Sequence, residues 1–331
     1  MSAKKVLVLG GTGLLGYATT RELVARGYQV TSVALPPIPT DDLFAEFGDA
    51  VDSRLEDVTA FSDEQLAELV AGHYAVMYAI GADERTVPPA PAARFFYEAN
   101  VLPTQRIAAA ARDAGVEKFV VYGSYFAEFA QTKPELGLQH EAYPIMRLLQ
   151  EQVAFAEGDG AMDVTSLRLP YIFGTMPGRM PLWKMFVDQI RGQQVFPAHP
   201  GGITAAVTTR QVAQAAVGAM EQGEHRGTYA LGGYNLSHQE FYETIVRRLG
   251  QDTQVPLVPF EALEPTLAEL DRQAAEQGVE HGIHMVLSGR VRAVDLGIDP
   301  KPVMATLGYE QDDVPAAIEQ TLDVVLADPQ P

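Results

Sequence analysis

Short apolar runs alternate with helical patterns along the first half of the chain. Residues 6–9 are apolar and end in glycines, and the amphipathic spacing over 14–26 predicts a helix that ends before Gly27. Further strands are predicted at 29–35, 76–80, 119–122 and 164–169, with a helix at 95–114. Strands separated by helices imply a parallel sheet covered on both faces. We therefore expect an α/β fold with a Rossmann-type doubly wound parallel sheet.

The pattern changes after Gly174, where Pro and Gly interrupt the chain and helices are set among the loops. Ser237 and Glu240 have the spacing of a capping box, which predicts a helix that runs to Gly250. Another helix is predicted at 265–277. We expect residues 1–174 to form a dinucleotide-binding Rossmann domain. Residues 175–331 should be mostly a smaller α/β substrate-binding cap, with some segments returning to the Rossmann sheet.

Composition narrows the range of partners. The 331 residues carry a net charge of -19, which repels phosphate backbones and anionic lipids, although solubility alone also accounts for such a charge. We expect a small-molecule substrate, no nucleic acid and no membrane. The absence of Cys excludes disulfides and thiolate sites, and the His spacing suggests no metal site. The first residues lack the long apolar stretch and cleavage site of a signal peptide, so we expect a cytoplasmic protein.

A glycine-rich turn joins the first strand to the first helix, and Gly10, Gly13 and Gly16 are spaced three apart in it. The first glycine allows a positive φ, the second allows close approach of a pyrophosphate, and the third allows the helix to pack on the strand. Free N–H groups at the start of the helix then bind phosphate. The residues expected to bind a dinucleotide here are Gly10, Thr12, Gly13, Leu14, Leu15 and Gly16.

The choice between NAD and NADP depends on the end of the second strand. NAD selection usually needs an acidic residue there, and NADP selection a basic one. The segment 34–39 reads ALPPIP and offers neither. Because no Arg or Lys is available there for a 2′-phosphate, we favour NAD and keep NADP as the alternative.

Five further motifs follow the turn in a fixed order. They are Asp57-Val58, YAIGA at 78–82, Asn100-Val101, FVVYGS at 119–124 and LRLPYIFG at 167–174. Each alone is also explained as an ordinary loop, helix start or buried strand. Together they resemble the extended short-chain dehydrogenase/reductase family, the NAD-dependent epimerase/dehydratase group, over roughly residues 5–250.

The resemblance implies roles for individual residues. Asp57 and Val58 would contact the adenine, and Ile80 and Gly81 would lie beside the cofactor ribose. Asn100 is at the position that opens the fourth helix of the family and is also expected to bind the cofactor. The segment that contains Pro170 and Tyr171 would pass the nicotinamide, and Ser124 is the catalytic Ser at the end of the fifth strand.

The catalytic pair departs from the family pattern, in which a Tyr exchanges the substrate proton and a Lys four residues later binds the ribose and lowers the Tyr pKa. The chain has no Tyr-x-x-x-Lys. Its two Tyr-x-x-x-Arg pairs are Tyr17/Arg21, on the glycine-turn helix, and Tyr143/Arg147. Tyr143 follows Ser124 by nineteen residues, and Pro144 is suited to the first turn of a helix. We therefore expect Ser124, Tyr143 and Arg147 to be catalytic, with Arg147 in place of Lys and turnover in doubt for that reason.

Two functions remain open at this point. One is an NAD(P)-dependent oxidoreductase or epimerase that acts on a C–OH or C=O group with Tyr143 as acid/base. The other is a non-catalytic NAD(P)-binding sensor or regulatory protein on the same fold. Arg168, Arg179 and Arg210 are candidates for binding an anionic substrate. A stripe of Ile145, Leu149, Val153 and Ala156 indicates either a homodimer contact or burial against the sheet.

Overall fold

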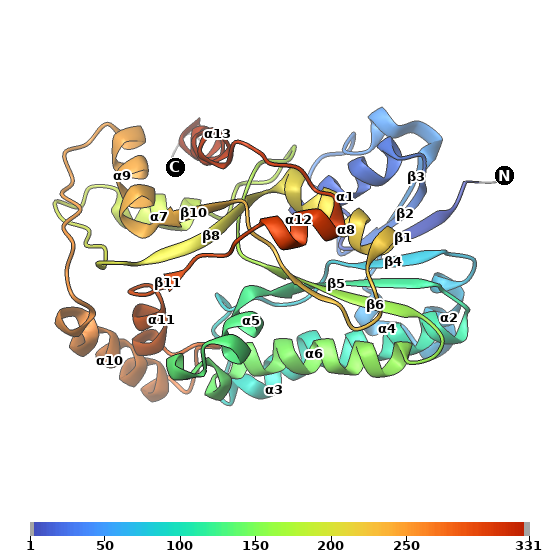
Figure 1. Cartoon of the computed structure of the whole chain (residues 1–331), viewed down its shortest axis with the longest axis horizontal. Helices are drawn as coiled ribbons and strands as arrows, with labels where there is room; N and C mark the ends of the chain where they lie inside the picture. The colour runs from blue at the N-terminus through green and yellow to red at the C-terminus, as the bar shows by residue number, and fades with distance from the viewer. Residues whose placement is uncertain (1–2, 328–331) are drawn as a thin grey trace.

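The computed structural model describes residues 3–327 and is built on a seven-stranded parallel sheet (Figure 1). In spatial order its strands are β3 (Val51–Leu55), β2 (Gln29–Ala34), β1 (Lys5–Leu9), β4 (Ala75–Tyr78), β5 (Lys118–Ser124), β6 (Asp163–Leu169) and β9 (Thr228–Ala230). Every pair of neighbours in the sheet is parallel. This order confirms the expected Rossmann-type doubly wound sheet.

Both faces of the sheet are apolar, because both are covered by helices. Val6 and Val8 of β1 pack toward α1 (Leu14–Ala25) and α8 (Thr209–Gln222). Leu7 and Leu9 point to the opposite face, where the covering helices are α2 (Asp63–Val70), α4 (Leu102–Asp113) and α6 (Ala142–Gly158). The continuous apolar run of β1 therefore reflects burial on two sides.

The helix expected at 95–114 is interrupted. The chain forms α3 (Ala92–Phe96), a π-helical segment (Tyr97–Val101) and then α4. Pro103 has no N–H to donate to the carbonyl four residues earlier, so the helical ladder is broken near this point. The π-helical segment contains the fully buried Asn100.

A second, four-stranded sheet lies beside the large one (Figure 1). Its strands are β7 (Tyr171–Phe173), β8 (Ile203–Thr208), β10 (Tyr234–Ser237) and β11 (Asp295–Leu296). The remaining helices are α5 (Tyr125–Thr132), α7 (Lys184–Ile190), α9 (His238–Leu249), α10 (Phe260–Glu276), α11 (Met285–Val291), α12 (Lys301–Leu307) and α13 (Val314–Ala327). Among residues 3–327 no helix is long and apolar enough to cross a membrane.

One half of the predicted capping box of α9 is present, since the Ser237 side chain accepts a hydrogen bond from the backbone N–H of Glu240. The Glu240 carboxylate accepts from the Tyr234 hydroxyl, and no bond to it from the backbone N–H of Ser237 is found among the described residues. The helix expected at 265–277 begins earlier, at Phe260, and Pro265 lies inside it.

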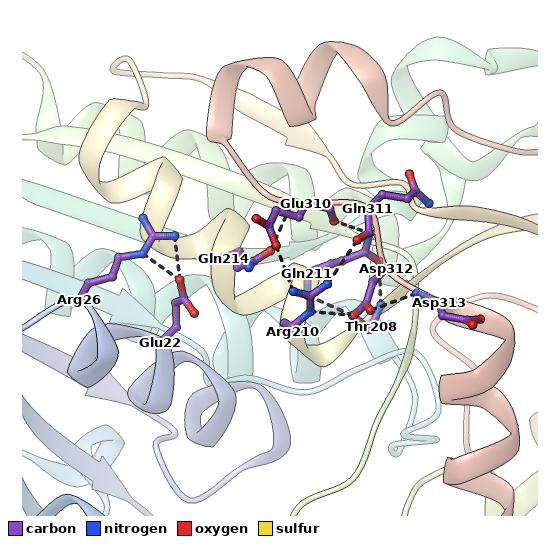
Figure 2. A network of polar contacts seen from close by, with 10 residues as sticks. All are labelled: Glu22, Arg26, Thr208, Arg210, Gln211, Gln214, Glu310, Gln311, Asp312 and Asp313. Atoms are coloured by element: carbon purple, nitrogen blue, oxygen red, sulfur yellow. Dashed lines mark hydrogen bonds and ion pairs between the residues drawn. The ribbon is translucent and has the colours of Figure 1, made fainter.

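A polar network ties the chain after α12 to the start of α8 (Figure 2). Arg210 donates to Asp312 at 3.0 Å and to Glu310 at 3.1 Å. The Thr208 hydroxyl, at the N-cap of α8, also donates to Asp312. These contacts join α8, which packs against α1 beside the large sheet, to the last part of the described chain.

Candidate functional site

The site is assembled at the carboxyl end of β1 and β4, where the strand order of the large sheet reverses. The glycine-rich turn follows β1 and lies against the end of β4. Gly10 has φ +84°, and a Cβ on it would be 2.4 Å from the Ala79 carbonyl oxygen and 3.0 Å from the Ile80 side chain. Gly10 is therefore required for both its conformation and its packing, as expected.

Gly13 and Gly16 are glycines for different reasons. A Cβ on Gly16 would be 2.2 Å from the Gly10 carbonyl oxygen, so the turn itself excludes a side chain. Gly13 has an ordinary extended conformation (φ -84°, ψ 166°), and a Cβ on it would be 3.1 Å from the Gly10 carbonyl oxygen. The backbone conformation therefore does not require glycine, but the turn leaves little room for a side chain. No side chain caps the start of α1.

The remaining glycine-turn residues are Thr12, which is buried, and Leu14 and Leu15, which are partly buried at the start of α1. The Thr12 carbonyl oxygen accepts a bond of 3.3 Å from Arg179, which lies in the loop after β7. A Cβ on the neighbouring Gly178 would be 2.4 Å from the Pro39 carbonyl oxygen. The fold thus brings a guanidinium beside the turn and the loop after β2, where the sequence has no basic residue.

The residues expected to contact the adenosine and ribose lie at the same edge of the sheet. Asp57 follows β3 and accepts hydrogen bonds from the backbone N–H and hydroxyl of Thr59, while the Val58 side chain is buried in the core. Gly81 has φ +136°, and a Cβ on it would be 2.5 Å from Asn100 Oδ1. Asn100 accepts from the backbone N–H of Ala82 at 2.7 Å. Asn100 therefore holds the loop after β4 rather than pointing freely into solvent.

Tyr143 and Arg147 lie one turn apart on α6, and both are buried, at 2% and 7% exposure. Arg147 Nε donates to the Tyr143 hydroxyl at 3.0 Å, and Arg147 Nη1 donates to Gln150 Oε1 at 2.7 Å. Gln150 in turn donates to the Thr104 hydroxyl at 2.9 Å. The guanidinium is thus held by neutral partners that fix its position against the phenol.

Ser124 ends β5 and interacts through its hydroxyl with the Tyr143 phenol. Phe96 packs on the Tyr143 ring at 5.3 Å between ring centroids, which encloses the phenol further. Burial raises the pKa of Tyr143 above its ordinary value, and the opposing effect of Arg147 does not cancel it. The phenol is therefore protonated at neutral pH and suited to donate a proton.

Tyr171 and Pro170 connect β6 to β7, so they pass from the large sheet to the small one. Tyr171 is 6.4 Å from Tyr125 between ring centroids. Electrostatic interactions also link Tyr125 to Tyr143. The expected nicotinamide segment therefore lies on the same side as the catalytic residues.

Glu84 is a site residue that the sequence analysis missed. It lies in the loop after β4 and interacts electrostatically with Tyr143 and Arg147. Burial and the neighbouring Asp83 raise the pKa of its carboxyl group. The segment ADERT at 82–86 gave no signal for this placement, because acidic residues are ordinary in loops.

The three arginines considered for anion binding have different partners. Arg168 is buried in ion pairs with Glu151 and Glu128. Arg210 is engaged in the network of Figure 2, and Arg179 contacts the glycine turn. Two of the three guanidinium groups are therefore already paired with carboxylates.

Comparisons with known proteins identify the family of the chain. The family model "NAD dependent epimerase/dehydratase family" matches residues 6–232. The chain is 25% identical over 270 residues to the 4-hydroxy-2-methyl-3-oxo-4-farnesyl-3,4-dihydroquinoline-1-oxide ketoreductase of Stigmatella aurantiaca, covering 78% of this chain and 77% of that protein. It is 26% identical over 203 residues to the 2-alkyl-3-oxoalkanoate reductase of Stenotrophomonas maltophilia, covering 56% of each.

Among solved structures, a double mutant of the dTDP-glucose 4,6-dehydratase of Streptomyces venezuelae with NAD bound superposes with a TM-score of 0.70. The alignment covers 98% of this chain and 97% of that one at 18% identity, so it bears on the fold alone. The family match covers well over half of the chain and includes the glycine-rich turn, Ser124 and Tyr143. The chain belongs to the NAD-dependent epimerase/dehydratase family and takes NAD(P) as its cofactor.

Proposed function

We propose that the protein reduces a carbonyl group of a small molecule with NAD(P)H, with Tyr143 as the proton donor. The observation that carries the proposal is a buried Tyr143 whose hydroxyl accepts a hydrogen bond of 3.0 Å from Arg147 Nε, with the Ser124 hydroxyl also acting on the phenol. The two curated relatives described above are named as a ketoreductase and a reductase, which supports the reductive direction.

Four residues of the chain have separate roles in the proposed reduction. The bound cofactor supplies hydride chemistry. Ser124 holds the substrate oxygen beside Tyr143, and the Tyr143 hydroxyl donates its proton to that oxygen as negative charge develops there. Arg147 stabilises the phenolate that remains, and its permanent charge replaces that of the family lysine. Gln150 keeps the guanidinium in place.

The fit of the cofactor rests on the glycine turn. Gly13 has no side chain to obstruct an approaching pyrophosphate, the first turn of α1 is uncapped, and Arg179 lies beside Thr12. We infer that the pyrophosphate is held by the turn, with Arg179 adding a cation. The Arg179 guanidinium lies near the loop after β2, where selection of NADP usually needs a basic residue. Binding of both NADH and NADPH should therefore be measured.

The test is nicotinamide absorbance over a panel of ketones and oxo acids for the parent, Tyr143→Phe, Arg147→Lys and Arg147→Met. Tyr143→Phe should lose about 10²–10⁴-fold in turnover. Arg147→Lys should retain turnover and Arg147→Met should lose most of it. Equal turnover in the parent and Tyr143→Phe would contradict the mechanism.

The same assay separates an enzyme from a sensor. A sensor would bind NAD(H) in calorimetry and reduce nothing on the panel, and Tyr143→Phe would leave cofactor affinity unchanged. Gly13→Val tests the cofactor site in either case, and the thermal unfolding midpoint is its control, because a Cβ there would be 3.1 Å from the Gly10 carbonyl oxygen. Affinity should fall at least about tenfold while the thermal unfolding midpoint is retained.

We also propose that two copies pair through α6. Ile145 and Leu149 are each 36% exposed there, and Leu102 of the adjacent α4 is 41% exposed. The stripe thus faces away from the sheet, against the alternative of burial. Light scattering of the parent and of Ile145→Lys tests this pairing, and a monomeric mass for the parent would overturn it.

A further inference from the structure

Arg292 is a cation of the second sheet region that no carboxylate neutralises. It follows α11, and among residues 3–327 it forms no ion pair with Asp or Glu. Its guanidinium donates to the backbone carbonyl and the hydroxyl of Ser288, both at 3.3 Å. The Tyr242 phenol interacts with this guanidinium through its hydroxyl. A cation held only by neutral oxygens retains its attraction for an anion.

His238 lies next to this cation and is itself short of a partner. It is 4% exposed, and its Nδ1 atom has no hydrogen-bond partner within the described chain. Its ring lies 6.0 Å from that of Tyr171 and 6.1 Å from that of Tyr242. Burial and the charge of Arg292 lower the pKa of His238 to about 3, so the ring is neutral at pH 7. Buried nitrogen atoms without partners are uncommon in folded proteins, which suggests that a ligand supplies one.

Two tyrosines link Arg292 to the catalytic residues. The phenols of Tyr125 and Tyr171 both interact electrostatically with the guanidinium. Tyr125 also interacts with Tyr143, and its hydroxyl lies 3.3 Å from that of Thr204 on β8. Phe126 lies 6.2 Å from Tyr143 and 4.7 Å from Tyr125 between ring centroids, so a series of rings connects Tyr143 to the residues around Arg292.

The two ends differ in the acids around their cations. Glu84 interacts with both Tyr143 and Arg147 at the catalytic end. At the other end Arg292 forms no ion pair with Asp or Glu among residues 3–327. We propose that Arg292, together with Tyr171, Tyr242 and His238, binds the carboxylate of a substrate whose carbonyl group is reduced at Tyr143. This inference rests on the proposed function and narrows the substrate class to oxo acids.

The composition of this cluster favours a carboxylate over a diphosphate. Arg292 is its single cation, because His238 is neutral, and the phenols supply only weak donors. One guanidinium and two hydroxyl groups match the charge and the two oxygens of a carboxylate. A diphosphate would bring at least twice that charge into a protein of net charge -19.

The experiment compares 3-oxobutanoate, 4-oxopentanoate and 5-oxohexanoate with their methyl esters. Arg292→Gln should lower the ratio of kcat/KM for acid over ester by about 10–100-fold, as expected for loss of a charge-assisted contact. Arg292→Lys should restore part of the ratio. The control is Arg290→Gln, because Arg290 lies on α11 at 49% side-chain exposure, pairs with Glu264 and lies over the Phe260 ring. Acids and esters affected equally in Arg292→Gln would overturn the proposal.

Calorimetry keeps this inference separate from the proposed function. Butanoate should bind to the NAD-loaded parent and to Arg290→Gln, and at least about tenfold more weakly to Arg292→Gln. Uridine diphosphate binding more tightly than butanoate at Arg292 would overturn the assignment to a carboxylate. If no carbonyl compound is reduced, the proposed function fails, yet Arg292-dependent binding of butanoate still supports the anion site. If butanoate binds equally to the parent and to Arg292→Gln, the proposed anion site is wrong even if reduction occurs.

Discussion

Two buried guanidinium groups meet α6 about one helical turn apart, and their surroundings differ. Arg168, on β6, donates to Glu151 of α6 at 2.7 and 3.0 Å and to Glu128 at 2.6 Å. Arg147, on α6 itself, donates only to neutral groups, the Tyr143 hydroxyl and Gln150. Both side chains are almost inaccessible to solvent.

This difference between Arg168 and Arg147 distinguishes a cation that stabilises the fold from one that acts on a bound molecule. A buried charge needs compensation, and Arg168 receives it in full from two carboxylates. Arg147 has no carboxylate within ion-pair distance in the described part of the chain, so its field acts on Tyr143 and on whatever binds there. Full compensation within the protein therefore indicates a role in stability, and incomplete compensation indicates a role in binding or catalysis.

The largest expected effect is on stability at Arg168. Arg168→Met leaves Glu151 buried without its partner, so the free energy of unfolding should fall by about 3–5 kcal/mol. Arg147→Met removes only hydrogen bonds to neutral groups and should cost about 1–2 kcal/mol. Urea unfolding of both variants at pH 7 measures the two losses. Similar losses of unfolding free energy in the two variants would contradict the distinction between Arg168 and Arg147.

His238 extends the comparison, because it avoids an uncompensated charge by staying neutral. Its folded pKa of about 3 lies below the unfolded value near 6.5, so the unfolded state binds the proton first as pH falls. This stabilising contribution is complete above pH 6.5 and is lost as pH falls toward 3. At pH 4.5 the loss should reach about 2–3 kcal/mol.

The measurement is urea unfolding of the parent and of His238→Asn at pH 7 and pH 4.5. The variant should lose less stability between the two pH values than the parent, because Asn does not titrate. Equal losses would show that His238 is not held neutral by burial.

The pH profile of reduction sharpens the account of Tyr143. Burial raises the pKa of this phenol, so reduction should not fall between about pH 6 and pH 9 through loss of its proton. Glu84→Gln removes a negative charge that raises the Tyr143 pKa, and should move the alkaline fall in rate to lower pH by up to about one pH unit. Arg147→Met should move it to higher pH. Shifts in the opposite directions would contradict these electrostatic assignments.

The smallest expected effect concerns a compensated but exposed cation. Arg210 pairs with Asp312 and Glu310 at 48% side-chain exposure (Figure 2). Water screens such pairs, so Arg210→Ala should lower the free energy of unfolding by no more than about 1 kcal/mol. Urea unfolding beside Arg168→Met checks this, and a loss as large as that of Arg168→Met would show that exposure does not control the contribution.

Local patterns accounted for much of the fold. The strand, glycine turn and helix at 6–26 and the cap at Ser237 were predictable because neighbouring residues determine them. The helix at 95–114 was predicted as continuous, and the π-helical segment was missed because periodicity does not report a change in hydrogen-bond register. The start of the helix near 265 was also wrong, since Pro265 is accommodated inside α10.

The sequence by itself determined the parallel sheet, the dinucleotide turn and the spacing of Tyr143 and Arg147 on one helical face. Those features depend on contacts between residues close in the chain or on the two-sided burial of strands. Only the tertiary structure decided which arginine is compensated. Arg168 meets Glu128 across 40 residues, and the phenols that interact with Arg292 come from strands and helices far away in the chain. Compensation of a buried charge is a property of the space around it, and folding alone brings those groups together.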